Sequence, residues 1–184
     1  MHRDIKPANV FLTLRGGVAD FVKVLDFGLV KARDSQGGAE LTLADSTLGT
    51  PLYMSPEAVE HSDEVDARSD LYSLGAVGYF LLTGEALFDC LTLGEVMMHQ
   101  VKHLPVQPSR RLGKPVSPDL EELLMSCLAK NPASRPASAR QLDDALARCR
   151  SAKDWTREMA DEWWRKFVAI QSEKTMVTTP SARK

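Results

Sequence analysis

Residues 2–9 have the sequence His-Arg-Asp-Ile-Lys-Pro-Ala-Asn, and two further short motifs follow them in the chain. Asp-Phe-Gly occupies residues 26–28, and Gly-Thr-Pro-Leu-Tyr-Met-Ser-Pro-Glu occupies residues 49–57. A match to three residues alone carries little information. All three motifs in this order, with a loop-length gap between the last two, are improbable as a chance event and predict one shared functional site.

The segments around these motifs predict a small β-hairpin followed by a long loop. Residues 10–14 and 21–25 are short apolar runs rich in β-forming residues, and Arg-Gly-Gly lies between them at 15–17. Two such runs joined by a glycine-containing segment predict antiparallel strands. Residues 33–50 are rich in Asp, Ser, Gly and Thr without a clear period, which predicts a loop of the length that usually carries function or is disordered.

The rest of the chain predicts helices, so the expected fold class is mainly α with a small β-hairpin. Prolines and Ser or Asp residues supply the predicted helix starts. Asp70 is the predicted N-cap of the second helix, and Gly84 is its predicted C-terminal stop. The predicted helices cover residues 56–61, 70–83, 92–102, 118–130 and 138–150.

A further helix is predicted at residues 154–171, where Trp155, Met159, Trp163, Phe167 and Ile170 fall on one face. This face is expected to dock on the rest of the chain. The alternative is a partner-binding surface, and it stays open because the adjacent residues 163 and 164 are both tryptophan and cannot face one groove together. Residues 172–184 have low hydrophobicity and are expected to fray.

Composition excludes several classes of protein. The 184 residues are 43% hydrophobic and 26% charged with a net charge of −2, which fits a globular domain without a bulk attraction to nucleic acid or acidic membranes. Cys90, Cys127 and Cys149 are scattered, so neither a disulfide framework nor a zinc site is predicted. The apolar stretch at 71–82 is too short to span a bilayer. A cytoplasmic location is expected, in a soluble protein or in the cytoplasmic part of a membrane-anchored one.

Taken together, the three motifs resemble the catalytic segments of eukaryotic-type serine/threonine protein kinases, most closely in the style of bacterial members. The resemblance covers roughly residues 1–150 and implies the C-terminal lobe of that α+β fold. It also implies ATP-dependent phosphorylation of Ser or Thr hydroxyls of protein substrates, with Mg²⁺ or Mn²⁺, in signal transduction. The Asp-x-Lys-x-x-Asn spacing from Asp4 to Asn9, together with Thr50, resembles serine/threonine kinases more than tyrosine kinases.

The resemblance assigns chemical roles to a few residues. Asp4 would be the catalytic base, Lys6 would steady the transferred phosphate, and Thr50 would line the site. Asn9 and Asp26 would bind the metal, since hard cations prefer oxygen ligands. The residues expected to contact ATP are Lys6, Ala8, Asn9, Phe11 and Asp26.

Other residues receive structural or regulatory roles from the same resemblance. Arg3 would pair with a phosphate on Thr42 or Thr47, although a merely polar loop explains either hydroxyl equally well. Asp70 would hold the backbone of the catalytic loop. Glu57 and Arg135 would form an ion pair. The residues to which the resemblance gives structural or regulatory roles are His2, Arg3, Phe27, Gly28, Thr42, Thr47, Glu57, Asp70 and Arg135.

Two family elements are absent from the sequence: a Gly-rich loop with GxGxxG spacing, and a Val-Ala-Ile-Lys strand. The N-terminal lobe is therefore expected to be absent from these residues and to be a missing partner from a longer chain, in which Met1 is an internal residue. The alternatives are that Met1 is a true start and that the chain is a non-catalytic, truncated interaction module. The expected organisation is a kinase-like lobe at 1–150, a helix at 151–171 and a flexible tail at 172–184.

Overall fold

The computed structural model describes residues 1–25, 51–61 and 63–177, with side chains described up to residue 170. The predicted hairpin is present: β1 (Val10–Arg15) pairs antiparallel with β2 (Val18–Val24). Gly16 and Gly17 connect the strands with φ angles of 57° and 78°, which only glycine adopts at little cost. The predicted loop at 33–50 lies outside the described residues.

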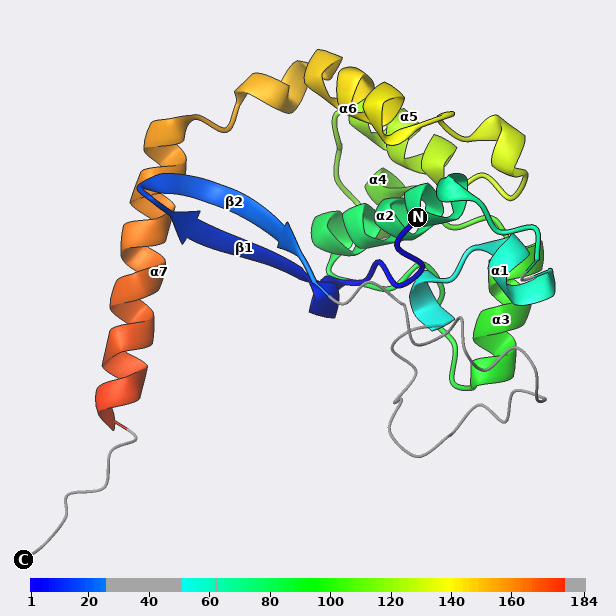
Figure 1. The fold of residues 1–184 in the computed structure, drawn as a ribbon, viewed down its shortest axis with the longest axis horizontal. Helices are drawn as coiled ribbons and strands as arrows, with labels where there is room; N and C mark the ends of the chain where they lie inside the picture. Colours follow the sequence, from blue (N-terminus) through cyan, green and yellow to red (C-terminus); the bar gives the residue numbers. More distant parts are fainter. Residues whose placement is uncertain (26–50, 62, 178–184) are drawn as a thin grey trace, which may run out of the picture.

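Helices make up most of the remaining described chain, as predicted (Figure 1). In the figure α2 runs through the middle of a helical body, and the hairpin extends away from this body toward α7. The helices are α1 (Pro56–Glu60), α2 (Ala67–Thr83), α3 (Leu93–Lys102), α4 (Pro108–Leu112), α5 (Pro118–Cys127), α6 (Ala139–Arg148) and α7 (Arg157–Val177). Short 3₁₀ turns are η1 (Pro7–Asn9), η3 (Pro51–Tyr53), η4 (Pro132–Ser134) and η5 (Arg150–Lys153).

Some helix boundaries differ from the prediction. Helix α2 begins at Ala67 with Asp66 as its N-cap, so the prediction that Asp70 caps this helix was wrong. The predicted stop at Gly84 is confirmed, with φ at 76°. Helix α5 ends at Cys127 rather than residue 130, and the backbone carbonyl groups of residues 129 and 130 accept hydrogen bonds from the Arg135 side chain. Helix α4, which starts at a proline, was not predicted.

The core lies around α2. Tyr72, Ala76 and Tyr79 are almost fully buried and pack against Leu87 and Leu128. The apolar run that forms α2 is thus a buried helix of the body, as its length predicted. Within the part of the chain that the structure describes, no helix is long and apolar enough to cross a membrane.

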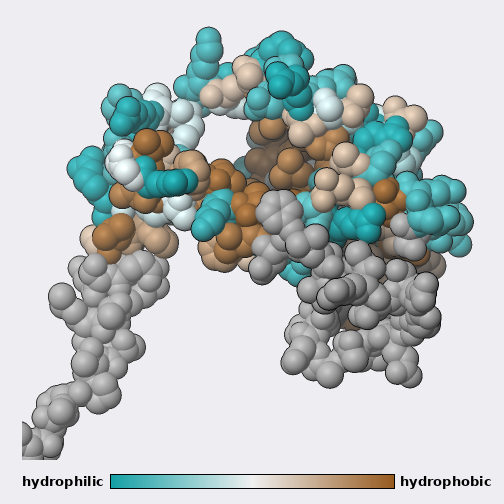
Figure 2. Space-filling model, viewed as in Figure 1, coloured by the Kyte–Doolittle hydropathy of each residue, from teal (hydrophilic) through white to brown (hydrophobic). Residues whose placement is uncertain are grey.

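The segment containing α7 contacts the hairpin, but the tryptophan that it buries there, Trp164, is not part of the predicted stripe. Trp155, Met159, Trp163 and Phe167 of the predicted stripe remain 39–51% exposed, whereas Trp164 is only 9% exposed. The indole N–H groups of residues 155 and 164 donate to the two carboxylate oxygens of Asp20 on β2, at 2.7 and 2.8 Å. Figure 2 shows apolar surface on the hairpin and α7. The helix also continues to residue 177, past the predicted start of fraying.

Candidate active site

The loop at residues 2–4 is held by a carboxylate of α2. Asp70 accepts the backbone N–H groups of His2 at 2.6 Å and Arg3 at 2.8 Å. Arg3 has a φ of 70°, a left-handed conformation that is uncommon for a non-glycine residue and needs such support. The His2 ring lies between the backbone N–H of Asp4, at 3.4 Å, and the carbonyl oxygen of Leu25, at 3.1 Å. This arrangement fits a tautomer in which Nδ1 accepts and Nε2 donates.

Asp4, Lys6 and Asn9 meet at the end of this loop. Lys6 Nζ lies 2.9 Å from Asp4 Oδ2, and Asn9 Nδ2 donates to the same oxygen at 3.0 Å and to the Asp4 carbonyl at 2.8 Å. Asn9 is 5% exposed, and its backbone carbonyl accepts the backbone N–H of Leu25 at 2.9 Å. The turn η1 thus places a carboxylate, an ammonium and an amide together, beside the residue that precedes Asp26.

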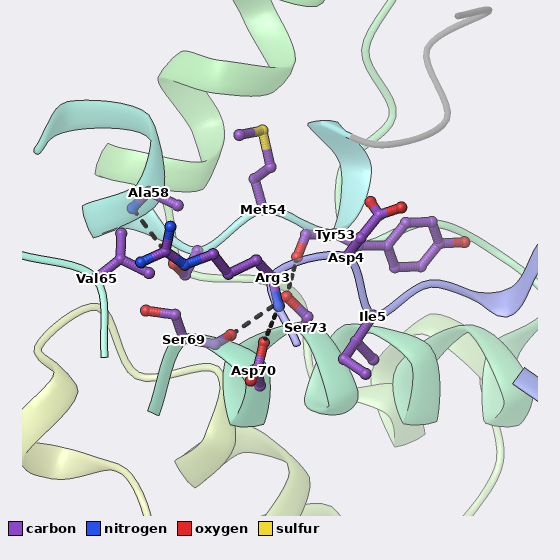
Figure 3. A pocket seen from close by; sticks show the side chains of 11 residues that line it. Arg3, Asp4, Ile5, Tyr53, Met54, Ala58, Val65, Ser69, Asp70 and Ser73 are labelled. Atoms are coloured by element: carbon purple, nitrogen blue, oxygen red, sulfur yellow. Dashed lines mark hydrogen bonds between the residues drawn. The ribbon is translucent and has the colours of Figure 1, made fainter. Parts of the chain in front are cut away.

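A cavity of about 170 Å³ opens beside Asp4. Its walls come from the loop at 3–5, from Tyr53 at the end of η3 and Met54 after it, and from α1 and α2. In Figure 3 the Arg3 side chain extends toward Ala58, while Asp4 lies near Tyr53. Asp4, Tyr53 and Met54 thus line one cavity.

The predicted ion pair between Glu57 and Arg135 is present and buried. Arg135 donates to both carboxylate oxygens at 2.7 Å each, and Ser69 donates to one of them at 2.5 Å. Burial alone would raise the pKa of Glu57, but the hydrogen bonds from Arg135 and Ser69 outweigh burial and lower it. The pair fixes the start of α1, directly after the cavity wall.

Several predicted site residues lie outside the described part of the chain: Asp26, Phe27, Gly28, Thr42, Thr47 and Thr50. Ala8 and Phe11 are described and exposed, on either side of Asn9. Residues 1–25, 51–61 and 63–177 contain no group of three His, Cys, Asp or Glu side chains that could hold a metal.

Sequence reasoning missed Gln100, a fully buried amide on α3 that bonds to the backbone of η3. The available signal was its position four residues after the buried Val96, which puts a polar side chain on the apolar face of the helix.

The sequence is similar to those of known proteins. Residues 1–146 match the family described as protein kinase domain. Over 141 residues the chain is 45% identical to serine/threonine-protein kinase pkn3 of Myxococcus xanthus, covering 76% of this chain and 26% of that protein. It is 42% identical over 147 residues to Pkn1 of the same organism, covering 79% and 20%, and 40% identical over 148 residues to PknB of Mycolicibacterium smegmatis, covering 80% and 23%. The chain thus spans between a fifth and about a quarter of the length of these curated relatives.

Proposed function

We propose a function from the premise that the chain belongs to the protein kinase domain family. The function is ATP-dependent phosphorylation of Ser or Thr hydroxyls in protein substrates, performed as part of a longer polypeptide. The observation that best supports this function is the contact of the Asp4 carboxylate with both Lys6 and Asn9. The named serine/threonine kinases among the relatives support the choice of acceptor.

In this proposal Asp4 is the base. Its carboxylate is held in one orientation by the Lys6 ammonium and the Asn9 amide. The substrate hydroxyl gives its proton to Asp4 while its oxygen bonds to the γ-phosphorus of ATP, and the bond to the leaving ADP oxygen breaks. Lys6 stays within reach of the phosphate because its Nζ lies beside the same carboxylate. Positioning and charge compensation supply most of the catalysis in such transfers.

Magnesium would supply neutralisation of the phosphate charge when bound. The Asn9 amide nitrogen donates to two oxygens of Asp4, so the amide oxygen is not used in these bonds and is of the kind that hard cations prefer as a ligand. Asp26 is the second proposed ligand. Ala8 and Phe11 are proposed to contact the nucleotide. Thr50 is proposed to contact Asp4 and Lys6.

The proposed nucleotide site is completed by an N-terminal lobe outside these 184 residues. Phe11, Leu12 and Val22 on the hairpin are 46–54% exposed, which supports cover from another segment. We place the protein, or this part of it, in the cytoplasm, where ATP is available and where the free cysteines at 90, 127 and 149 stay reduced.

The deciding experiment compares full-length wild type with Asp4→Asn and with Asp143→Asn, an exposed control on α6. Phosphate transfer from labelled ATP to a Ser/Thr-containing protein is expected to fall by about 10²–10⁴-fold in Asp4→Asn, the range for loss of a general base. The control should retain the wild-type rate. Equal rates in all three proteins would contradict the role of Asp4.

A second candidate function, a non-catalytic interaction module, draws support from the exposed stripe on α7 that includes Trp163 and Phe167. A thermal-shift assay with Mg-ATP separates the two. Stabilisation of the full-length protein supports a nucleotide site, whereas no shift in a folded protein supports the module.

A further inference from the structure

A buried polar network joins α3 to the turn that builds the cavity wall. Gln100 has no exposed surface, and its Nε2 donates to the carbonyl oxygens of Pro51 at 3.2 Å and Leu52 at 2.8 Å. Its Oε1 accepts from the hydroxyl of Tyr72 at 2.5 Å. That hydroxyl in turn accepts from Lys130 Nζ at 3.1 Å. One amide therefore links segments that are far apart in the sequence.

The direction of each bond in this network is fixed by chemistry. Lys130 can only donate, so the hydroxyl of Tyr72 uses its proton for Gln100. The amide of Gln100 must then present its oxygen to Tyr72 and its two N–H bonds to η3. Lys130 also donates to the backbone carbonyl of Gln100 at 2.6 Å, in the last turn of α3. The amide consequently has one orientation in which all partners are satisfied.

The anchored turn carries the substrate-facing wall. Directly after the two anchored carbonyls, Tyr53 and Met54 line the cavity beside Asp4. The backbone N–H of Met54 donates to the same Pro51 carbonyl at 3.2 Å. Gln100 itself lines no part of that cavity. A shift of this turn would move the wall relative to Asp4 without touching Lys6 or Asn9.

We propose that Gln100 is a positioning residue for the protein substrate, which acts by holding η3 so that Tyr53 and Met54 guide the acceptor hydroxyl to Asp4. This inference rests on the proposed kinase function and adds a determinant of substrate binding to it. Only a side chain with one acceptor and two donors fits the position. A glutamate would place a carboxylate oxygen against the carbonyl oxygens of Pro51 and Leu52, which is repulsive. A methionine would leave both carbonyl oxygens without a hydrogen-bond donor from position 100.

The test uses the full-length protein as wild type, Gln100→Met, Tyr72→Phe and the control Met98→Gln. Met98 is 44% exposed on the same helix, so its variant makes the reverse chemical change outside the network. Steady-state kinetics are measured with a Ser/Thr peptide and with ATP varied separately. We expect the KM for peptide to rise about ten-fold in Gln100→Met, the equivalent of about 1.4 kcal/mol. The KM for ATP should stay within about two-fold in every variant, and Tyr72→Phe should shift the peptide KM in the same direction by less.

An unchanged peptide KM in folded Gln100→Met would overturn the inference, and so would a KM for ATP that rises equally. If Gln100→Met does not fold, Tyr72→Phe decides by the same criteria. If wild type transfers no phosphate at all, the kinase proposal fails separately. Amide hydrogen exchange at residues 51–54 then decides the anchoring: faster exchange in Gln100→Met than in Met98→Gln supports it, and equal exchange overturns it.

Discussion

Removing the arginine of the buried ion pair is expected to bring the chain close to unfolding. Arg135→Met would leave the Glu57 carboxylate, whose side chain is 9% exposed, without its charged partner. Breaking a buried pair from one side costs about 3–5 kcal/mol. Arg135 also donates to the carbonyl oxygens of Arg68, Ala129 and Lys130, at 2.8–3.2 Å, so the loss should lie at the upper end of that range.

The assay is urea unfolding of the 184-residue chain followed by helical circular dichroism. Every tryptophan of the chain lies in 155–164, at the hairpin end, so fluorescence would report α7 rather than the body. A domain of this kind has about 5–15 kcal/mol of stability, so a loss near 5 kcal/mol would be large. The matched control is Arg68→Met, which breaks an exposed pair with Asp66 and should cost less than about 1 kcal/mol.

Two further results are expected from the same pair. Glu57→Met combined with Arg135→Met should cost less than Arg135→Met alone, because no buried charge is left. The pKa of Glu57 is lowered in the folded state, so its contribution is present above its unfolded pKa and is lost as pH falls through the folded pKa. A loss below about 1 kcal/mol for Arg135→Met, or strictly additive losses in the double variant, would refute this reasoning.

Three other predictions concern packing, the tail helix and titration. Asp20→Ala should release α7, seen as a red shift of tryptophan emission with unchanged body helicity, because both indole bonds to that carboxylate are lost. Gly75→Ala should cost about 1–3 kcal/mol, since its Cβ would lie 2.8 Å from Cys127 Cβ, whereas Gly78→Ala meets only the end of a leucine side chain and should cost less. Burial, and then the charge of a nearby arginine, lowers the pKa of Lys130 to about 8, so wild-type stability relative to Lys130→Met should rise from pH 8 toward 10.

Each of these predictions has a result that contradicts it. Unchanged emission in Asp20→Ala would mean that the indole bonds do not hold α7, and Asp143→Asn serves as the exposed control. Equal losses at positions 75 and 78 would show that the Cys127 Cβ yields as easily as the end of the Leu124 side chain. Between the folded and unfolded pKa values of Lys130, the unfolded chain binds more protons than the folded chain, so stability rises with pH. A stability difference between wild type and Lys130→Met that falls with pH would therefore exclude a lowered pKa.

The hairpin and most helix starts were predictable because their signals are local. Two glycines at 16–17 supply the positive φ angles of the turn, and Thr92 and Ser138 cap the helices that follow them. The start of α2 was not predictable in this way. Asp66 and Asp70 both have the chemistry of an N-cap, and tertiary contact decides between them, because Asp70 is occupied by backbone N–H groups from the loop at 2–3.

In the candidate site, too, contacts between sequence neighbours were predictable and contacts between distant residues were not. Asp4, Lys6 and Asn9 are neighbours in sequence, so a motif predicts their meeting. The partners of Gln100 lie 28 to 49 residues away in sequence, so no local pattern specifies its bonds to η3. A glutamine on an apolar helix face indicates that some buried polar partner exists, because an unpaired amide is costly to bury. Only the fold identifies that partner.

The face of α7 shows why periodicity alone was misleading. The stripe at 155, 159, 163 and 167 has the better apolar spacing, but spacing says nothing about what the opposing surface offers. The hairpin offers Asp20, whose two oxygens accept two indole N–H groups, so the helix turns Trp164 inward. Strand β1 of that hairpin begins directly after Asn9, the proposed metal ligand. The hairpin is therefore anchored at its base, where the backbone N–H of Leu25 donates to the backbone carbonyl of Asn9, and near its tip, where Asp20 accepts the two indole N–H groups.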